Sequence, residues 1–230
     1  MSHSIYYFAI APQNRLYQQL CEDKATYILL ARAICQYDFE IFNCIENNND
    51  PADLEGIDNV LEPLIEEFPD AFPTKDQAVK IVQRFQTDVK NYSIDTARLS
   101  SHLYPEIERR LIEILSSSSD KDSELISQLI WSQNLLDPHG IYPSNVHQIH
   151  QISSPVVQAG ATLLRDIPPE ILFNISEYLP TGDEAEDSIR RREFYINANW
   201  DDDDVDEYQK WWNLYLQAAE AQNEVLTVIS

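Results

Sequence analysis

Glycine is scarce in this chain, which has four glycines and twelve prolines in 230 residues. Such a chain has few tight hairpins and few loops that cradle phosphate, and it favours helices punctuated by proline. No Walker loop, dinucleotide-binding fingerprint or G-x-S-x-G motif occurs, so hydrolase and kinase chemistry has no support in the sequence. We therefore assign no catalytic residue and no cofactor, and the sequence favours a protein that is not an enzyme.

Basic residues are also few, with 16 of them against 39 acidic residues and a net charge of −23. Phosphate backbones and anionic membrane surfaces repel such a chain, so we expect neither a nucleic acid nor a membrane as its partner. An acidic surface can instead steer a basic protein toward it. The alternative is that the acidity only keeps the protein in solution.

Cysteine occurs three times, as Cys21, Cys35 and Cys44, without a C-x-x-C pair. An odd number of unpaired thiols in apolar helical segments indicates buried cysteines in a reducing compartment rather than a disulfide framework. The N-terminal "IYYFAIAP" is too short to span a membrane and follows no basic region, so it predicts neither an anchor nor a signal peptide. We expect a cytoplasmic protein, and the sequence leaves its oligomeric state open.

Aromatic and β-branched residues dominate both ends of the chain. "IYYFAIA" (Ile5 to Ala11) and the closing "EVLTVIS" each predict a strand. Neither has a hairpin partner nearby in the sequence, so pairing the two strands in one sheet would satisfy their backbone groups. Amphipathic segments between them predict helices, including "PTKDQAVKIVQRFQTDV", where Thr74 and Gln77 have the spacing of a capping box.

These patterns predict a helix-rich α+β fold in a single domain over residues 1–230. The terminal strands form one small mixed sheet packed by helices, and residues 46–135 form a helical insertion within the domain. "SSPVVQAGATLL" and "DIPPEILFNISEYL" predict two later helices, each opened by a capping residue before proline. "DPHGIYPSNVHQIHQ" is rich in turn residues and predicts an irregular segment.

Several of these segments resemble the YfbM-like family of bacterial proteins of unknown function. "YYFAIAPQNRLYQQL" is similar to the opening strand and helix of that family, and "SSPVVQAGATLLRDIPPEIL" is similar to its late helix pair. "FYINANWDDDD" and "YLQAAEAQNEVLTVIS" resemble its aromatic-rich turn, last helix and last strand. The resemblance covers the two ends and most of the chain after Ser153. It implies a layered fold with both terminal strands in one sheet, and it implies no activity, cofactor or catalytic residue.

The segment "NWDDDDVDEYQKWW" holds the most conspicuous candidate site. Starting a calcium loop at Asp202 would put Glu207 where the loop needs glycine and Asn213 where it needs a bidentate glutamate, so an EF-hand is rejected. Aspartates before a helix instead cap its free amide groups and interact favourably with its dipole. As candidate partner-binding residues we take the acidic run and two neighbouring aromatic residues, namely Trp200, Asp201, Asp202, Asp203, Asp204 and Trp211.

The paired tryptophans should differ in burial if a helix begins near Val205. At roughly 100° per residue, Trp212 falls near the centre of the apolar stripe, whereas Trp211 lies roughly 80° away at its rim. The pattern therefore predicts that Trp212 belongs to the core. Trp211, at the rim beside the aspartates, would then be the anchor for a partner.

His139, His147 and His150 are the candidate metal ligands, because imidazoles three residues apart can share a helical face and the "DPHG" turn could add another ligand. No H-E-x-x-H pattern or matched cysteine accompanies them, so surface histidines are the favoured interpretation and no metal site is assigned.

The leading hypothesis is a soluble acidic protein that acts by binding another protein. A specific form of it is an immunity or inhibitor protein that neutralises a basic toxin or enzyme by charge complementarity. The alternative is a small-molecule hydrolase or metal-dependent enzyme that uses the region of His139, His147 and His150.

Overall fold

The computed structural model of the protein describes residues 4–36, 61–90, 96–115, 120–140, 148–174, 200 and 202–229. Its centre is a sheet of four strands in the order β2–β1–β4–β3. The strands are β1 (Ile5–Ile10), β2 (Thr96–Leu99), β3 (Ile149–Ile152) and β4 (Glu224–Ile229). The predicted helix-rich α+β class is confirmed.

The two ends of the chain pair with each other in the middle of this sheet. β1 and β4 run antiparallel from Ile5 opposite Ile229 to Ile10 opposite Glu224, which confirms the expected pairing. β2 adds to β1 and β3 adds to β4, both also antiparallel. All three pairs of described strands are antiparallel, so the predicted mixed sheet is corrected to an antiparallel one.

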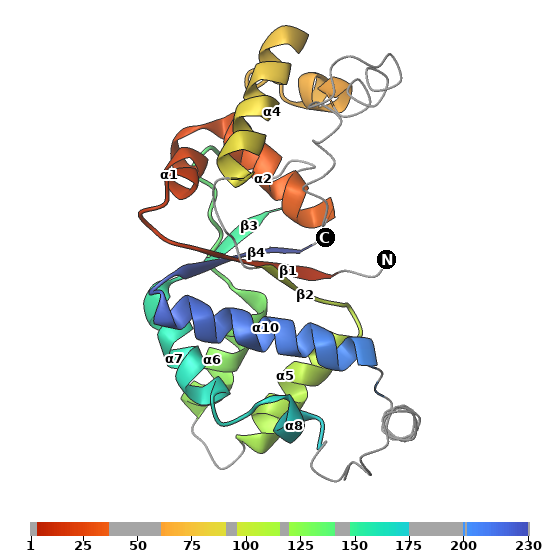
Figure 1. The fold of residues 1–230 in the computed structure, drawn as a ribbon, viewed down its shortest axis with the longest axis vertical. Helices are drawn as coiled ribbons and strands as arrows, with labels where there is room; N and C mark the ends of the chain where they lie inside the picture. The colour runs from red at the N-terminus through yellow and green to blue at the C-terminus, as the bar shows by residue number, and fades with distance from the viewer. Residues whose placement is uncertain are drawn as a thin grey trace.

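Helices cover both faces of the sheet (Figure 1). One face, which we name the α2 face, carries α1 (Arg15–Glu22), α2 (Lys24–Gln36), a helical stretch at residues 61–67 and α4 (Lys75–Lys90). The other, the α10 face, carries α5 (Leu103–Ile114), α6 (Asp120–Trp131), α7 (Ser154–Leu164), α8 (Pro169–Leu172) and α10 (Asp202–Glu220). No helix in the described part of the chain combines the length and apolar character that crossing a bilayer requires.

Alternation along β1 divides the buried residues between two cores. Successive side chains of a strand point to opposite faces. Thus Tyr6 and Phe8 join the core of the α2 face, and Ile5 and Tyr7 join the core of the α10 face. All six residues of β1 are buried, so the strand is hydrophobic along its whole length.

The range 46–135, predicted as a helical insertion, contributes more than helices in its described part. It supplies β2, which pairs with β1 at one edge of the sheet. It also supplies α4 to the α2 face, and α5 and α6 to the α10 face. These elements belong to both cores, so the described part of the range is built into the fold; the boundaries of the domain stay a prediction.

Local signals explain where several helices begin and end. The amide of Gln77 donates to Thr74 Oγ1 at 3.3 Å, as the capping-box spacing predicts. α8, in contrast, ends at Leu172, and Asn174 adopts a left-handed backbone with φ of 55°. A left-handed residue cannot continue a helix, so the predicted helix through "DIPPEILFNISEYL" is wrong at this point. Residues 175–199 lie outside the described residues.

Candidate functional site

The acidic run forms the start of α10. Asp202, Asp203 and Asp204 occupy its first turn, where negative charge interacts favourably with the helix dipole. Asp202 and Asp203 are exposed, whereas Asp204 is only 5% exposed and lies 2.8 Å from His102 Nε2. Asp201 lies outside the described residues. The run therefore begins a helix, as the capping interpretation predicts.

A second acidic residue fastens this end of α10 to the sheet. Glu207 Oε2 accepts a hydrogen bond of 2.7 Å from the amide of Ser100. Ser100 follows β2, and His102 directly precedes α5. The carboxylates of Asp204 and Glu207 thus hold the start of α10 against the turn between β2 and α5.

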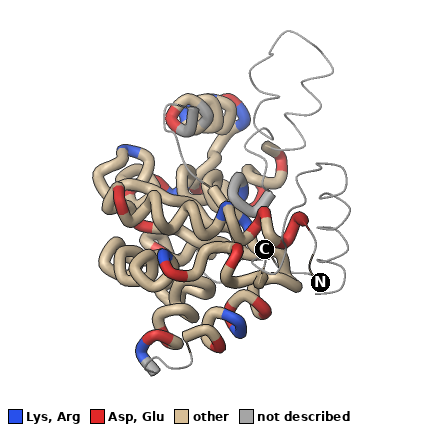
Figure 2. Tube along the Cα trace, turned by 60° about the horizontal axis from the view of Figure 1, so that its bottom comes forward, with Lys and Arg blue, Asp and Glu red and all other residues tan. Residues whose placement is uncertain are grey.

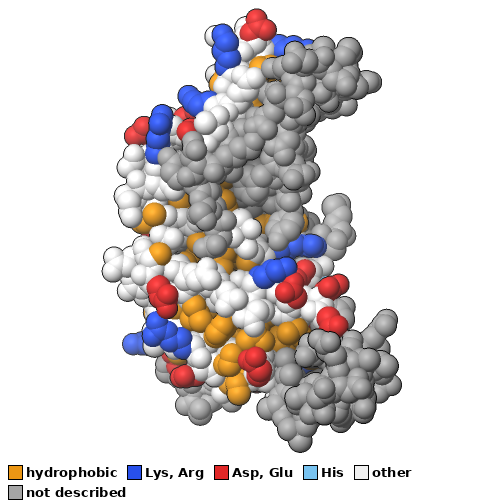
Figure 3. All heavy atoms as spheres, viewed as in Figure 1, with side chains coloured by type: hydrophobic (Ala, Val, Ile, Leu, Met, Phe, Trp, Pro, Cys, Tyr) orange, Lys and Arg blue, Asp and Glu red, His pale blue; other side chains and the backbone are white. Residues whose placement is uncertain are grey.

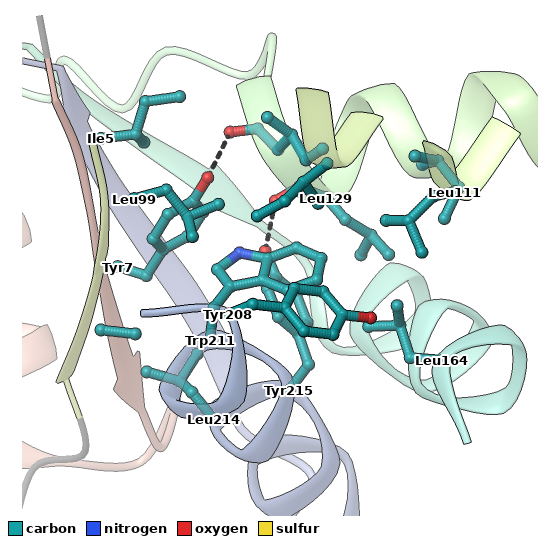
Figure 4. Packing of buried hydrophobic residues seen from close by; sticks show 14 of the residues in the cluster. Ile5, Tyr7, Leu99, Leu111, Leu129, Leu164, Tyr208, Trp211, Leu214 and Tyr215 are labelled. Carbon is teal, nitrogen blue, oxygen red and sulfur yellow. Dashed lines mark hydrogen bonds between the residues drawn. The ribbon is translucent and has the colours of Figure 1, made fainter. Parts of the chain in front are cut away.

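Trp211 lies in the core of the α10 face and is fully buried (Figure 4). Its ring packs edge-on against Tyr7, with 6.1 Å between centroids, and lies 4.9 Å from the ring of Tyr215. Trp212 is only half-buried, and its indole nitrogen donates to Leu164 O at 2.7 Å. The predicted rotation of α10 is therefore wrong, because Trp211 and not Trp212 points to the centre of the core.

The error has a physical reason. α10 packs against the sheet on one side and against α7 on the other, so its apolar arc is wider than one contact surface needs. Leu214 and Ala218 on one flank of that arc are buried, whereas Val205 and Leu216 on the other flank are half-exposed. The periodicity located the polar side of the helix, but it did not tell which apolar flank faces the sheet.

Trp200 is also a core residue, with 6% of its surface exposed. The Arg110 guanidinium lies 4.6 Å from its ring centroid, and Phe173 packs perpendicular to it at 4.8 Å. These two contacts, from α5 and from the end of α8, help to bury the indole. The assignment of Trp200, Asp204 and Trp211 as partner-binding residues is therefore withdrawn, because their side chains do not reach the surface.

The candidate metal ligands do not form a site in the described part of the chain. His139 Nε2 lies 2.9 Å from Leu20 O, and its ring packs edge-on against Tyr27. His150 lies on β3, where burial lowers its pKa. His147 lies outside the described residues. Among the residues that are described, no three histidine, cysteine or acidic side chains are grouped as a metal ion would require.

One flank of α10 carries apolar residues that are half-exposed at the surface. We name it the α10 flank and define it as Val205, Trp212, Leu216 and Ala219, all of which are half-buried. These residues lie within roughly 40° of Val205 around the helix and are spread over about four turns, with a gap of about two turns between Val205 and Trp212. Figure 3 shows hydrophobic side chains gathered on this side of the molecule, over α10 and the elements below it. On the neighbouring α8, Ile171 is 45% exposed.

One exposed acidic residue lies beside each end of the α10 flank. Asp202 and Glu220 lie roughly 60° around the helix from Val205, and both are exposed. Asp206 lies farther round and pairs with Lys210 at 2.6 Å. Figure 2 shows acidic residues on helices throughout the described chain, interspersed with basic residues. The flank therefore combines an apolar stripe with an exposed carboxylate at each end, and sequence periodicity missed it by placing its residues in the core.

The protein is therefore an antiparallel sheet covered by helices on both faces, and one flank of α10 is half-exposed at its surface. Comparison of the chain with protein-family models, with curated proteins and with solved structures gives no match. The resemblance to the YfbM-like family stays a prediction.

Proposed function

We propose that this protein acts by binding a basic protein, and that the α10 flank is the contact surface. The observation that carries the proposal is the half-exposed stripe around Trp212, with an exposed carboxylate, Asp202 or Glu220, beside each end of it. Interfaces combine an apolar centre, often with an aromatic anchor, with a polar rim. Trp212 serves as the anchor, since its hydrogen bond to Leu164 O already holds the indole in one orientation.

The charge of the whole chain supports the choice of partner. A net charge of −23 attracts a basic surface over a long range and repels an acidic one. The specific form of the proposal is an immunity or inhibitor protein that neutralises a basic toxin or enzyme. No observation in the described residues favours the alternative of a metal-dependent enzyme or hydrolase.

Paired variants test the location of the surface. Leu216→Ser removes an apolar side chain from the flank. Ile114→Ser makes the same kind of change on α5, at a residue that is 41% exposed. Asp202→Asn and Asp76→Asn each remove a charge from the first turn of a helix, on α10 and on α4 respectively. Basic proteins captured by the wild-type chain are compared for retention on all four variants. A genuine partner is lost with the two α10 variants and retained with the two controls.

The purified partner then allows a test of the charge mechanism. Because surface charges are screened beyond about 10 Å at 0.1 M salt, the Kd should rise about tenfold between about 0.05 M and about 0.3 M salt. Calorimetric titration measures this change. Equal retention by flank and control variants would refute the α10 flank as the contact, and a Kd that does not change with salt would remove charge from the mechanism.

A further inference from the structure

A small pocket opens where the end of α6, the start of α7 and β3 meet. Its volume is about 110 Å³, and its apolar walls are Ile152 of β3 and Val156 of α7. It lies apart from the α10 flank, because none of the residues that line it belongs to α10 or α8. A space of this size suits one small chemical group and is well below the several hundred Å³ of a typical site for a drug-sized ligand.

Hydrogen bonds hold the wall beside β3 in place. The amide of Gln151 donates to Asn134 O, and the amide of Leu136 donates to Ile149 O, both at 2.8 Å. The Ser132 hydroxyl donates to Gln151 O at 2.8 Å. Residues 132–136 thus already occupy this part of the outer edge of β3, so an added β-strand cannot bind there. The pocket is a preformed hollow rather than an open strand edge.

The polar side chains of the lining are all uncharged. They are the carboxamides of Gln128, Gln133, Asn134 and Gln151, together with the hydroxyl of Ser132. Gln151 uses its NH₂ group inside the protein, donating to Tyr17 Oη at 2.9 Å and to Glu224 Oε2 at 2.8 Å. Among the described residues, Gln128 makes only a long bond of 3.5 Å to Glu124, which a ligand can replace at little cost.

This chemistry selects a neutral ligand. None of the residues lining the pocket carries a charge that would neutralise a bound ion, and the net charge of −23 disfavours an anion. A carboxamide both donates and accepts hydrogen bonds in one plane, so its natural complement is another carboxamide. Ile152 and Val156 provide apolar walls for such a flat group.

We propose that this pocket binds a neutral primary carboxamide, with Gln128 as its main hydrogen-bonding partner and Gln133 and Asn134 at the exposed mouth. The group has two possible sources, a free small amide or the side chain of a glutamine in a peptide. The proposal is independent of the α10 flank and holds whether or not that flank binds a protein.

Titrations of the full chain observed by nuclear magnetic resonance test this assignment. Acetamide should shift the signals of the side-chain NH₂ groups of Gln128, Gln133 and Asn134, whereas acetate, its charged counterpart of the same shape, should leave them in place. Gln128→Leu should raise the Kd for acetamide about tenfold by removing its hydrogen bonds. Gln83→Leu is the matched control, because Gln83 is a half-buried glutamine on α4, on the other face of the sheet.

A second titration distinguishes the sources. Tighter binding of N-acetylglutamine methylamide than of acetamide assigns a peptide side chain, and binding of acetamide alone assigns a free amide. Equal shifts with acetate, shifts scattered over the surface, or the same loss with Gln83→Leu overturn the proposal. The shift map needs only the wild-type chain, so it stays decisive even if Gln128→Leu does not fold.

Discussion

The two faces of the sheet hold their helices in different ways. On the α2 face, β1 contributes Phe8 and Ile10 to a core that consists mostly of aliphatic and phenylalanine side chains. On the α10 face, tyrosine and tryptophan side chains pack beneath the helices and also bond to their backbones. Tyr7 donates to Ile130 O at 2.9 Å, and Tyr215 donates to Leu129 O at 2.6 Å (Figure 4).

The difference shows how a chain with little glycine ends its helices. The last carbonyl groups of a helix lack partners within it, and a glycine beyond the end usually helps to satisfy them. α6 is followed by Ser132 and α7 by Arg165. Instead, the hydroxyl groups of Tyr7 and Tyr215 bond to carbonyl groups at the end of α6. At the end of α7, Leu164 O accepts hydrogen bonds from both the Trp212 indole and the Ile167 amide. Polar aromatic residues therefore both fill the core and fix the helix ends.

The largest expected effect comes from removing the side chain of the buried tryptophan and comparing the cost with that of removing its half-exposed neighbour. Trp211→Ala should lower the free energy of unfolding by about 3–5 kcal/mol, the cost of deleting a buried aromatic side chain. Trp212→Ala should cost about 1–2 kcal/mol, because the side chain is half-exposed and loses one hydrogen bond. Unfolding in urea measures both variants. A larger loss for Trp212→Ala would show that the α10 face is packed differently.

Alkaline pH should weaken the α10 face next most strongly. Burial raises the pKa of Tyr7, Tyr208 and Tyr215, whereas the unfolded chain ionises tyrosine near pH 10. Above about pH 10 the unfolded state therefore binds fewer protons than the folded state, and the free energy of unfolding falls as the pH rises. The stability that is fully present below about pH 10 should drop by about 2–4 kcal/mol by about pH 11.

Urea unfolding at a series of alkaline pH values checks this slope, and Tyr215→Phe should flatten it. A free energy of unfolding that stays constant across the same range would contradict the burial of these three hydroxyl groups.

Removing single hydroxyl groups sharpens the comparison between the faces. Tyr7→Phe and Tyr215→Phe should each cost about 1–2 kcal/mol, because each leaves a buried carbonyl at the end of α6 without its partner. Tyr17→Phe is the control on the α2 face, since the bond that its hydroxyl accepts from Gln151 is only partly buried; it should cost less than either. Thermal unfolding ranks the three variants, and an equal cost for all of them would erase the proposed difference between the faces.

The smallest effects belong to the rim of the α2 face. Asp23 accepts bonds from the amide of Ala25 at 3.2 Å and from Thr26 Oγ1 at 2.8 Å, at the start of α2, and also pairs with Arg84. Asp23→Ala should cost about 1 kcal/mol as the loss of a helix cap. Arg84→Ala should cost less than about 0.5 kcal/mol, because half of its side chain is exposed and the pair is screened. A loss for Arg84→Ala as large as that for Asp23→Ala would mean that the cost of Asp23→Ala comes from its ion pair with Arg84 and not from the helix cap.

The sequence predicted the central strand pair and the start of α4 correctly, because both depend on local patterns. β1 is a continuous apolar run, β4 is apolar apart from Glu224 and Thr227, and the Thr74 cap needs only a residue three positions away. The edge strands were missed. "TARL" and "IHQI" are four residues long and become strands only by pairing with β1 and β4. The same limit applies to the polar pocket, whose lining comes from three separate elements.

By itself, the sequence determined the helix-rich class, the burial of β1 and the polar side of α10, since hydrophobic periodicity acts over a few residues. Only the tertiary structure decided which apolar flank of α10 meets the sheet. Trp211 is buried because Tyr7 and Tyr215 surround it, and Trp212 stays at the surface because α7 covers only part of it. Two flanks of similar apolarity have no local difference in energy, so contacts between residues far apart in the chain chose between them.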